Sequence, residues 1–415
     1  MLHRFAVHEF ARKRNTKGPI IGLIAVLATA IAGYTVYASP LTSYGVFQSQ
    51  SIDPIPEKIF SAPLENRVKN TRKEVVGFLP YWSVHNGASV YPEYMDQIIY
   101  FGLTMNKDGY IVKTDEDNNV TTEWSAMNSE RFKDIRSQAA KTDTKILFAV
   151  KNFSNDEIDQ LISNKVSTRR AIDAIKKILK TYDFDGVNID FEYVTRTDFP
   201  TSRFYNDFLS ILVEELRAEK ENVIVSLDVN ATAIYADNAY DMVKIGELVD
   251  QIIIMGYDYH RPVSRKAGPV APVSMSDDSP SISKSLDSLK GRVPSEKIIL
   301  GVPLYGYEWQ TRSTAYQSAT ISGTGAVATY KRVRELIEHR DDVSIQYDDL
   351  SQSPWLTYSQ NGLIKQIYYE DEKSLNAKIT VVQKRELGGM ALWALGYEGD
   401  YIEPWIVIKE GLRDP

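Results

Sequence analysis

Residues 184–192 carry the sequence FDGVNIDFE, and the fold of the chain can be worked out from this stretch. Apolar or aromatic residues stand at positions 187, 189 and 191, with Asn188, Asp190 and Glu192 at alternate positions. Side chains of a β-strand alternate between its two faces, so the three polar groups share one face and the apolar groups the other. Two carboxylates and an amide on one face, backed by an apolar face, indicate a strand with a chemical role.

The two carboxylates suit acid/base work on a glycosidic bond. Like charges at short range disfavour double ionisation, so a neighbouring carboxylate raises the pKa of an acid. Such an acid stays protonated near neutral pH and can donate to a leaving oxygen. A hydrogen-bonded acid cluster that only braces a strand is the alternative, and it is the commoner one for a lone Asp-x-Glu. Asp185-Gly186 extends the pattern to D-G-x-x-x-D-x-E, which favours the chemical interpretation.

This pattern resembles the catalytic signature of glycoside hydrolase family 18, which includes chitinases and related N-acetylglucosaminidases. The resemblance implies an α/β fold, a (β/α)8 TIM barrel with the signature on its fourth strand. The rest of the chain must then supply seven other strands in order, before and after this one.

The composition is that of an ordinary globular protein, with 43% hydrophobic and 25% charged residues. A net charge of −7 argues against a nucleic-acid partner. Cysteine is absent, which excludes disulfides, a thiolate metal site and a cysteine nucleophile, and the five histidines lack ligand spacing. The sequence therefore predicts no metal and no cofactor, and we expect a monomer.

The N-terminal region indicates membrane targeting. Residues 1–17 are basic, and residues 19–38 contain no charge over a length that can span a bilayer as a helix. We expect a cytoplasmic tail at 1–17, a transmembrane signal-anchor at 18–38 and a Ser/Pro-rich stalk at 39–73, with the catalytic domain outside the membrane. The alternative is a cleaved signal peptide, with Val36-Tyr37-Ala38 at the cleavage site, and a secreted protein.

Residues 74–415 alternate apolar strand-like runs with helical patterns, and we expect the catalytic barrel there. Strand candidates lie at 75–79, 97–103, 145–150, 186–191, 223–229, 251–255, 297–302 and 389–395. Amphipathic stretches such as 202–219 lie between them. Apolar strands that are each followed by a helix are typical of a parallel sheet covered on its outside, and eight such units predict a closed barrel.

A small α+β insertion is expected between the seventh and eighth strands, at about residues 308–370. Residues 330–339 have a helical pattern, and Asn361-Gly362 between two β-rich runs favours a tight hairpin turn. Family 18 members often carry an insertion in this gap, so the resemblance extends here. The glycines of residues 322–326 lack the Lys-Ser/Thr of a phosphate-binding loop, and we interpret that stretch as a plain loop.

Aromatic residues gather where the barrel strands are expected to end, which is the side that holds the active site in such barrels. Sugar rings stack their apolar faces on tryptophan and tyrosine, while acids and amides bind the hydroxyls. Core packing is the commoner role for any single aromatic residue. The cluster predicts a sugar-binding floor made of Tyr81, Trp82, Tyr257, Tyr305 and Trp393.

The resemblance assigns roles residue by residue. Glu192 matches the family's general acid/base, Asp190 the acid that orients the substrate's acetamido group, and Tyr257 a tyrosine that contacts that group. The expected substrate-binding residues are Asn188, Asp258, Trp393, Tyr81, Trp82, Met255 and Tyr305. The implied mechanism is the substrate-assisted one with retention, which needs no carboxylate nucleophile.

Two departures from the family pattern bear on the substrate and the pH optimum. Asn188 stands where many members have a third aspartate, which leaves one carboxylate fewer beside Asp190. The third strand, FAVKNF at 148–153, lacks the small Ser/Gly run common in chitinases and is more similar to bacterial cell-wall and spore-cortex N-acetylglucosaminidases. We expect cleavage of β-1,4 bonds at N-acetylglucosamine residues in peptidoglycan or chitin-like polymers. A lectin-like member without catalysis, or a structural cell-envelope protein with a decayed barrel, is the alternative.

Overall fold

The structure is a computed structural model that describes residues 72–193, 200–235, 240–276 and 278–413. The expected tail (1–17), signal-anchor (18–38) and nearly all of the stalk (39–73) lie outside these ranges and stay predictions. Within them, no helix has the length and apolar character needed to cross a bilayer.

Eight parallel strands close into a barrel in the order β1-β13-β7-β6-β5-β4-β3-β2. Their bounds are β1 Glu74–Pro80, β2 Gln97–Thr104, β3 Lys145–Asn152, β4 Gly186–Phe191, β5 Ile224–Asn230, β6 Gln251–Met255, β7 Ile298–Pro303 and β13 Gly389–Trp393. The predicted barrel is confirmed, and the signature stretch forms β4 as expected. The eighth strand ends at Trp393, earlier than the predicted residue 395.

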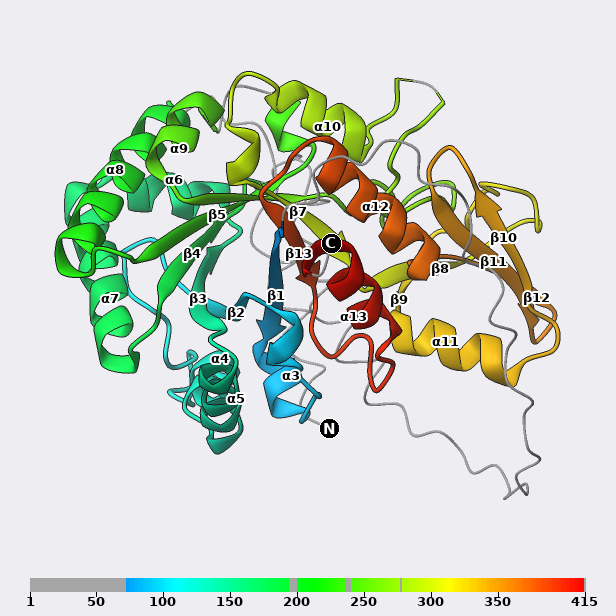
Figure 1. The fold of residues 1–415 in the computed structure, drawn as a ribbon, viewed down its shortest axis with the longest axis horizontal. Helices are drawn as coiled ribbons and strands as arrows, with labels where there is room; N and C mark the ends of the chain where they lie inside the picture. The colour runs from blue at the N-terminus through cyan, green and yellow to red at the C-terminus, as the bar shows by residue number, and fades with distance from the viewer. Residues whose placement is uncertain (1–71, 194–199, 236–239, 277, 414–415) are drawn as a thin grey trace.

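Helices cover the outside of the barrel (Figure 1). They are α3 Tyr81–His85, α4 Thr122–Met127, α5 Glu130–Lys141, α6 Asn155–Ser163, α7 Lys165–Tyr182, α8 Thr201–Glu219, α9 Met242–Leu248, α10 Ile282–Leu289, α12 Glu372–Lys384 and α13 Glu403–Ile408. The longest, α8, buries Phe208, Leu212 and Leu216 along one face, as the four-residue spacing predicts. This packing hides the outer faces of the strands and leaves their carboxyl ends for a site.

The insertion between β7 and β13 is a five-stranded antiparallel sheet with one helix, at the side of the barrel (yellow to orange in Figure 1). Its elements are β8 Tyr305–Gln310, β9 Ala326–Thr329, α11 Tyr330–His339, β10 Ser344–Asp348, β11 Ser353–Gln360 and β12 Leu363–Tyr368. Asn361 and Gly362 join β11 to β12 with φ of 53° and 76°, the double left-handed geometry of a tight primed turn. The sheet begins at Tyr305, slightly before the expected start, because β8 follows β7 after Leu304 alone.

The barrel interior is apolar on one side and polar on the other. Strands β1, β2, β3, β6, β7 and β13 contribute a cluster of apolar side chains that includes Val76, Ile99 and Ile253. Strands β4 and β5 instead contribute polar side chains at alternate positions, all of them buried: Asn188, Asp190, Ser226 and Asp228. The acids of the signature therefore belong to a polar sector that continues onto the next strand.

Candidate active site

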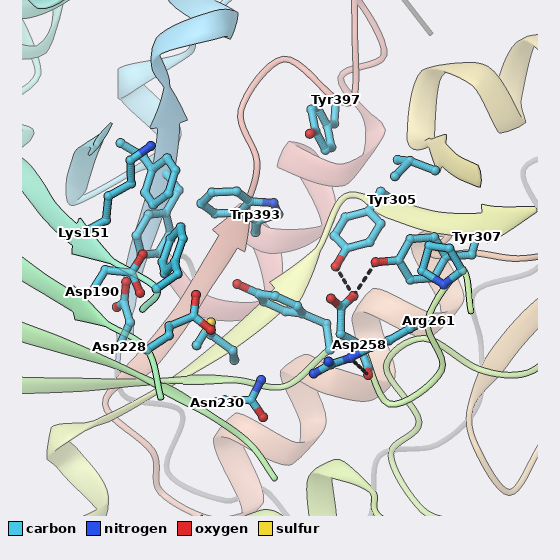
Figure 2. A pocket seen from close by; sticks show the side chains of 18 of the residues that line it. Lys151, Asp190, Asp228, Asn230, Asp258, Arg261, Tyr305, Tyr307, Trp393 and Tyr397 are labelled. Carbon is cyan, nitrogen blue, oxygen red and sulfur yellow. Dashed lines mark hydrogen bonds between the residues drawn. The ribbon is translucent and has the colours of Figure 1, made fainter. Parts of the chain in front are cut away.

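A cavity opens at the carboxyl ends of the barrel strands (Figure 2). It encloses about 1130 Å³ of empty space, its open mouth included, which is room enough for sugar rings. Eight of the residues predicted from the sequence line it: Trp82, Asp190, Glu192, Met255, Tyr257, Asp258, Tyr305 and Trp393. The structure thus brings together side chains from α3, from β8 and from the carboxyl ends of β4, β6 and β13.

The Asp185-Gly186 pair fixes how β4 enters the barrel. The Asp185 carboxylate accepts a hydrogen bond from the backbone N–H of Ile146 at 2.8 Å, which ties the start of β4 to β3. A Cβ on Gly186 would lie only 2.1 Å from the carbonyl oxygen of Ile224 on β5, so this position requires glycine. The pair sets the position of the strand from which Asp190 and Glu192 project.

The Asp190 carboxyl group is buried beneath the cavity. Its Oδ1 has no hydrogen-bond partner among the described residues. Burial raises the pKa of Asp190 well above its usual value, and the charges of Glu192 and Asp228 raise it further. A buried carboxyl oxygen without a protein partner suits a ligand that brings its own N–H or O–H donor.

Burial raises the pKa of Glu192 to about 7. The charge of Arg261 acts against this rise, and the charge of Asp258 adds to it. The sequence pattern points to a neighbouring carboxylate as the cause of a raised pKa. For Glu192 desolvation comes first, and a neighbouring carboxylate, that of Asp258, adds to it. A carboxyl group with a pKa of about 7 can both donate and accept a proton near neutral pH.

Asn188 does not line the cavity, although it was predicted to bind substrate. It is fully buried below Asp190, where its amide donates to Ser226 Oγ at 3.0 Å and to Asp228 Oδ1 at 2.8 Å. Asp228, on β5, lines the cavity and restores a third carboxyl group to the sector. Burial raises the pKa of Asp228 well above its usual value. The expected loss of one carboxylate at Asn188 is therefore offset by the neighbouring strand.

Lys151 is a cavity residue that the sequence analysis did not select. It stands opposite Asp190 in the register of β3 and β4, and its charge lowers the pKa of that acid. Its ammonium lies 3.6 Å from the Glu123 carboxylate and 5.0 Å from the centre of the Phe101 ring. Lys151 therefore places a positive charge beside Asp190, on the neighbouring strand.

The opposite wall of the cavity is built around Asp258. The Asp258 carboxylate accepts hydrogen bonds from the hydroxyls of Tyr305 and Tyr307 at 2.5 and 2.8 Å (Figure 2). Asp258 itself has φ of 61°, so the chain turns sharply after Tyr257 and brings Arg261 back to the cavity. Tyr307 and Arg261 were not predicted, because their approach depends on this turn and on the insertion sheet.

Trp393 lies between these two walls, as Figure 2 shows. Its ring meets Phe101 edge to face at a centroid distance of 4.7 Å and Trp82 at 6.2 Å. Trp82 keeps an indole N–H without a partner among the described residues. Tyr81, its neighbour in the chain, does not line the cavity and packs against the barrel core instead. Consecutive residues of a short helix point in different directions, which is why only one of the two predicted rings reaches the site.

Two further cavity residues with polar groups that the sequence did not suggest are Asn230 and Tyr397. Asn230 follows Ser226 and Asp228 at strand spacing in VIVSLDVN, so the alternation of polar residues in β5 was a usable signal. Within the part of the chain that the structure describes, no group of three or more His, Asp or Glu side chains is arranged to hold a metal ion.

Comparisons with known proteins bear on the family of the chain. The model of glycosyl hydrolases family 18 matches residues 74–398. A Bacillus subtilis protein named as a sporulation-specific glycosylase, YdhD, is 30% identical over 263 residues, 62% of this chain and 57% of that protein. The cortical fragment-lytic enzyme of Bacillus subtilis is 26% identical over 287 residues, 66% of this chain and 62% of that protein. The chain thus spans about three fifths of the length of these two relatives.

Solved structures share the fold. The Group IV chitinase of Ostrinia furnacalis in complex with allosamidin has a TM-score of 0.72 at 19% identity, over 82% of this chain and 99% of that one. The family 18 chitinase of Cycas revoluta in complex with (GlcNAc)3 has a TM-score of 0.69 at 17% identity, over 81% of this chain and 99% of that one. With the family model matched over most of its length, the chain belongs to glycosyl hydrolases family 18 and is by family a glycosidase.

Proposed function

We propose that the barrel hydrolyses β-1,4 bonds at N-acetylglucosamine residues by a substrate-assisted, retaining mechanism. The observation that carries the proposal is the meeting of Asp190, Glu192, Tyr257 and Trp393 in one cavity. Among them, Glu192 has a pKa of about 7 and Asp190 keeps a carboxyl oxygen without a partner in the described ranges. These are the groups that acid/base catalysis and acetamide binding require.

In the first step Glu192 protonates the glycosidic oxygen as the bond to the anomeric carbon breaks. The carbonyl oxygen of the substrate's own 2-acetamido group attacks that carbon and forms an oxazolinium ion. Asp190 accepts the acetamide N–H and Tyr257 donates to the acetamide oxygen, which holds the group in line for attack. Trp393 forms the apolar floor under the sugar ring.

In the second step Glu192, now ionised, removes a proton from water as the water attacks the anomeric carbon. The oxazolinium ring opens, the acetamide is regenerated and the product keeps its original anomeric configuration. One carboxyl group thus acts first as acid and then as base, for which a pKa of about 7 is well suited.

Peptidoglycan glycan strands are the polymer we propose, with chitin-like polymers as the second choice. Support comes from the FAVKNF third strand and from the similarity to the cortical fragment-lytic enzymes of Bacillus subtilis and Bacillus anthracis. The uncharged stretch at 19–38 further supports an extracytoplasmic catalytic domain, anchored in the membrane or secreted. We also propose that the protein acts as a monomer.

Digestion of purified peptidoglycan and colloidal chitin side by side tests this function. Mass analysis of the new reducing ends should find N-acetylglucosamine ends, released faster from peptidoglycan. An enzyme that leaves both polymers intact under conditions where a family 18 chitinase cleaves chitin would contradict the proposal.

The pH profile offers a second test, because Glu192 must be protonated for the first step. Its pKa is raised to about 7, so the acid form is present below that pH and is lost as the pH rises through it. We expect kcat/KM for a chromogenic N-acetylglucosaminide, measured from pH 4 to 9, to fall on the alkaline side with a midpoint near 7. A midpoint near 4.5, the ordinary value for glutamate, would contradict the assignment.

A further inference from the structure

The cavity contains a cation that the proposed mechanism does not use. Arg261 lines the wall opposite Lys151 and is half-buried (Figure 2). It belongs to the connection between β6 and α10. An arginine side chain in this connection that pointed into solvent would keep its hydration and so avoid the free-energy cost of desolvation. An arginine kept in a cavity of acids therefore requires an explanation.

The backbone around Arg261 is fixed from several directions. Its N–H donates to Ser264 Oγ at 2.8 Å. The indole N–H of the buried Trp309 lies 3.3 and 3.2 Å from the carbonyl oxygens of Arg261 and Pro262. Gly325 packs so closely that a Cβ there would lie 2.1 Å from the Pro262 oxygen. The insertion sheet and its loop thus fix the backbone from which the Arg261 side chain projects before any ligand arrives, which lowers the entropic cost of binding.

Arg261 faces a cavity that contains carboxyl groups, but it forms no ion pair with a described side chain. Its Nε donates to the backbone oxygen of Asp258 at 3.2 Å, and among the described residues no carboxylate lies within ion-pair distance of the guanidinium. The Asp258 carboxylate already accepts two tyrosine hydroxyls. Lys151, the other cation of the cavity, is paired with Glu123. The two terminal nitrogens of Arg261 remain as a planar donor edge, the geometry that binds a carboxylate through two parallel hydrogen bonds.

Arg261 lines the same cavity as the proton donor Glu192. Its charge lowers the pKa of both Glu192 and Asp258, in keeping with this shared location. A ligand group bound by this guanidinium would therefore belong to a sugar next to the cleaved bond.

We propose that Arg261 binds a carboxylate carried by a sugar that flanks the cleaved bond. The substrate class is then a polymer of N-acetylhexosamines in which alternate sugars bear an acidic substituent, such as the lactyl group of muramic acid. This inference rests on the proposed function and sharpens it, because a neutral chitin chain offers Arg261 no anionic partner. The acids of the cavity would disfavour such a substituent elsewhere, so Arg261 would determine both selectivity and register along the chain.

Two oligosaccharides that differ only in charge test the proposal. One is a peptide-free peptidoglycan tetrasaccharide with free lactyl carboxylates, and the other is the same molecule with those carboxylates converted to amides. The wild-type ratio of kcat/KM for the acid over the amide should fall at least about tenfold in Arg261→Gln, since a charged hydrogen-bonded pair is lost. Arg265→Gln, an equal charge change at an exposed position on the same loop, should leave the ratio unchanged.

A binding measurement separates this inference from the proposed reaction. In the Glu192→Gln background, calorimetry should find tighter binding of the acid than of the amide, and Arg261→Gln should remove that preference. Arg261→Lys should restore part of it, because the charge returns without the planar donor edge. Equal binding of the two oligosaccharides, or an equal loss for both in Arg261→Gln, overturns the role of Arg261. Absence of turnover in the wild type together with preferential binding of the acid would overturn the proposed reaction alone.

Discussion

Replacing Glu192 by glutamine is expected to lower hydrolysis by at least about a thousandfold while leaving substrate binding largely intact, because both proton transfers of the mechanism are lost. Glutamine keeps the size of the side chain and fits the cavity, but it can neither donate nor remove a proton. The measurement is kcat for a natural oligosaccharide, together with a calorimetric dissociation constant for the same molecule. A nitrophenyl glycoside, whose leaving group needs less protonation, should lose less activity than the oligosaccharide.

A matched control is Glu221→Gln, the same chemical change at an exposed position after α8. It should keep wild-type kinetics on both substrates. Near-wild-type turnover of the natural oligosaccharide by Glu192→Gln would remove Glu192 from its role as the acid.

Thermal unfolding separates a catalytic defect from a folding defect in the same variant. Burial raises the folded-state pKa of Glu192 to about 7, so between its ordinary value of 4.5 and that pH the folded state binds the extra proton. Stability contributed at this site therefore falls as pH rises through that window. Glutamine does not titrate, and Glu192→Gln should gain stability relative to the wild type from pH 5 to pH 8. An inactive variant that is at least as stable at pH 8 has lost chemistry and not its fold.

The barrel could be predicted because its strands are buried on both faces and form short apolar runs separated by helical patterns. Burial on both faces also made part of the site hard to recognise from the sequence. In β5 the polar residues Ser226 and Asp228 interrupt an apolar run, and that run predicts a strand without marking a site. The D-G-x-x-x-D-x-E pattern identified Asp190 and Glu192 because Asp185-Gly186 precedes the two acids at a fixed distance. It also suggested that Asn188 would face the substrate, whereas Asn188 lies one layer deeper.

Residues brought to the cavity by loops could not be predicted in this way. Arg261 reaches it through the left-handed turn at Asp258 and through contacts with Trp309, more than forty positions away. Tyr307 depends on where the insertion sheet joins the barrel. Neither position follows from local spacing, since both are set by contacts between distant segments.

Asp190→Asn is expected to lower kcat by about a hundredfold to a thousandfold, the range for loss of a preorganised electrostatic partner. Asp190 offers a buried oxygen to the acetamide N–H, and once ionised it would stabilise the positive oxazolinium ion. An asparagine can keep the hydrogen bond only in one orientation of its amide and carries no charge. The measurement is kcat for an N-acetylglucosamine oligosaccharide, with its KM recorded separately. Wild-type kcat in this variant would contradict the role of Asp190.

The alkaline side of the pH profile of Asp190→Asn distinguishes two accounts of the acid pair. If the pair shares a proton, as the sequence pattern suggested, removing Asp190 should lower the pKa of Glu192 and move the midpoint to a lower pH. In the structure the charge of Glu192 raises the pKa of Asp190, and repulsion between two like charges acts on both groups. We therefore expect the midpoint to move below pH 7 while kcat falls. A midpoint that stays near pH 7 would mean that burial alone sets the pKa of Glu192, and that loss of Asp190 affects acetamide binding only.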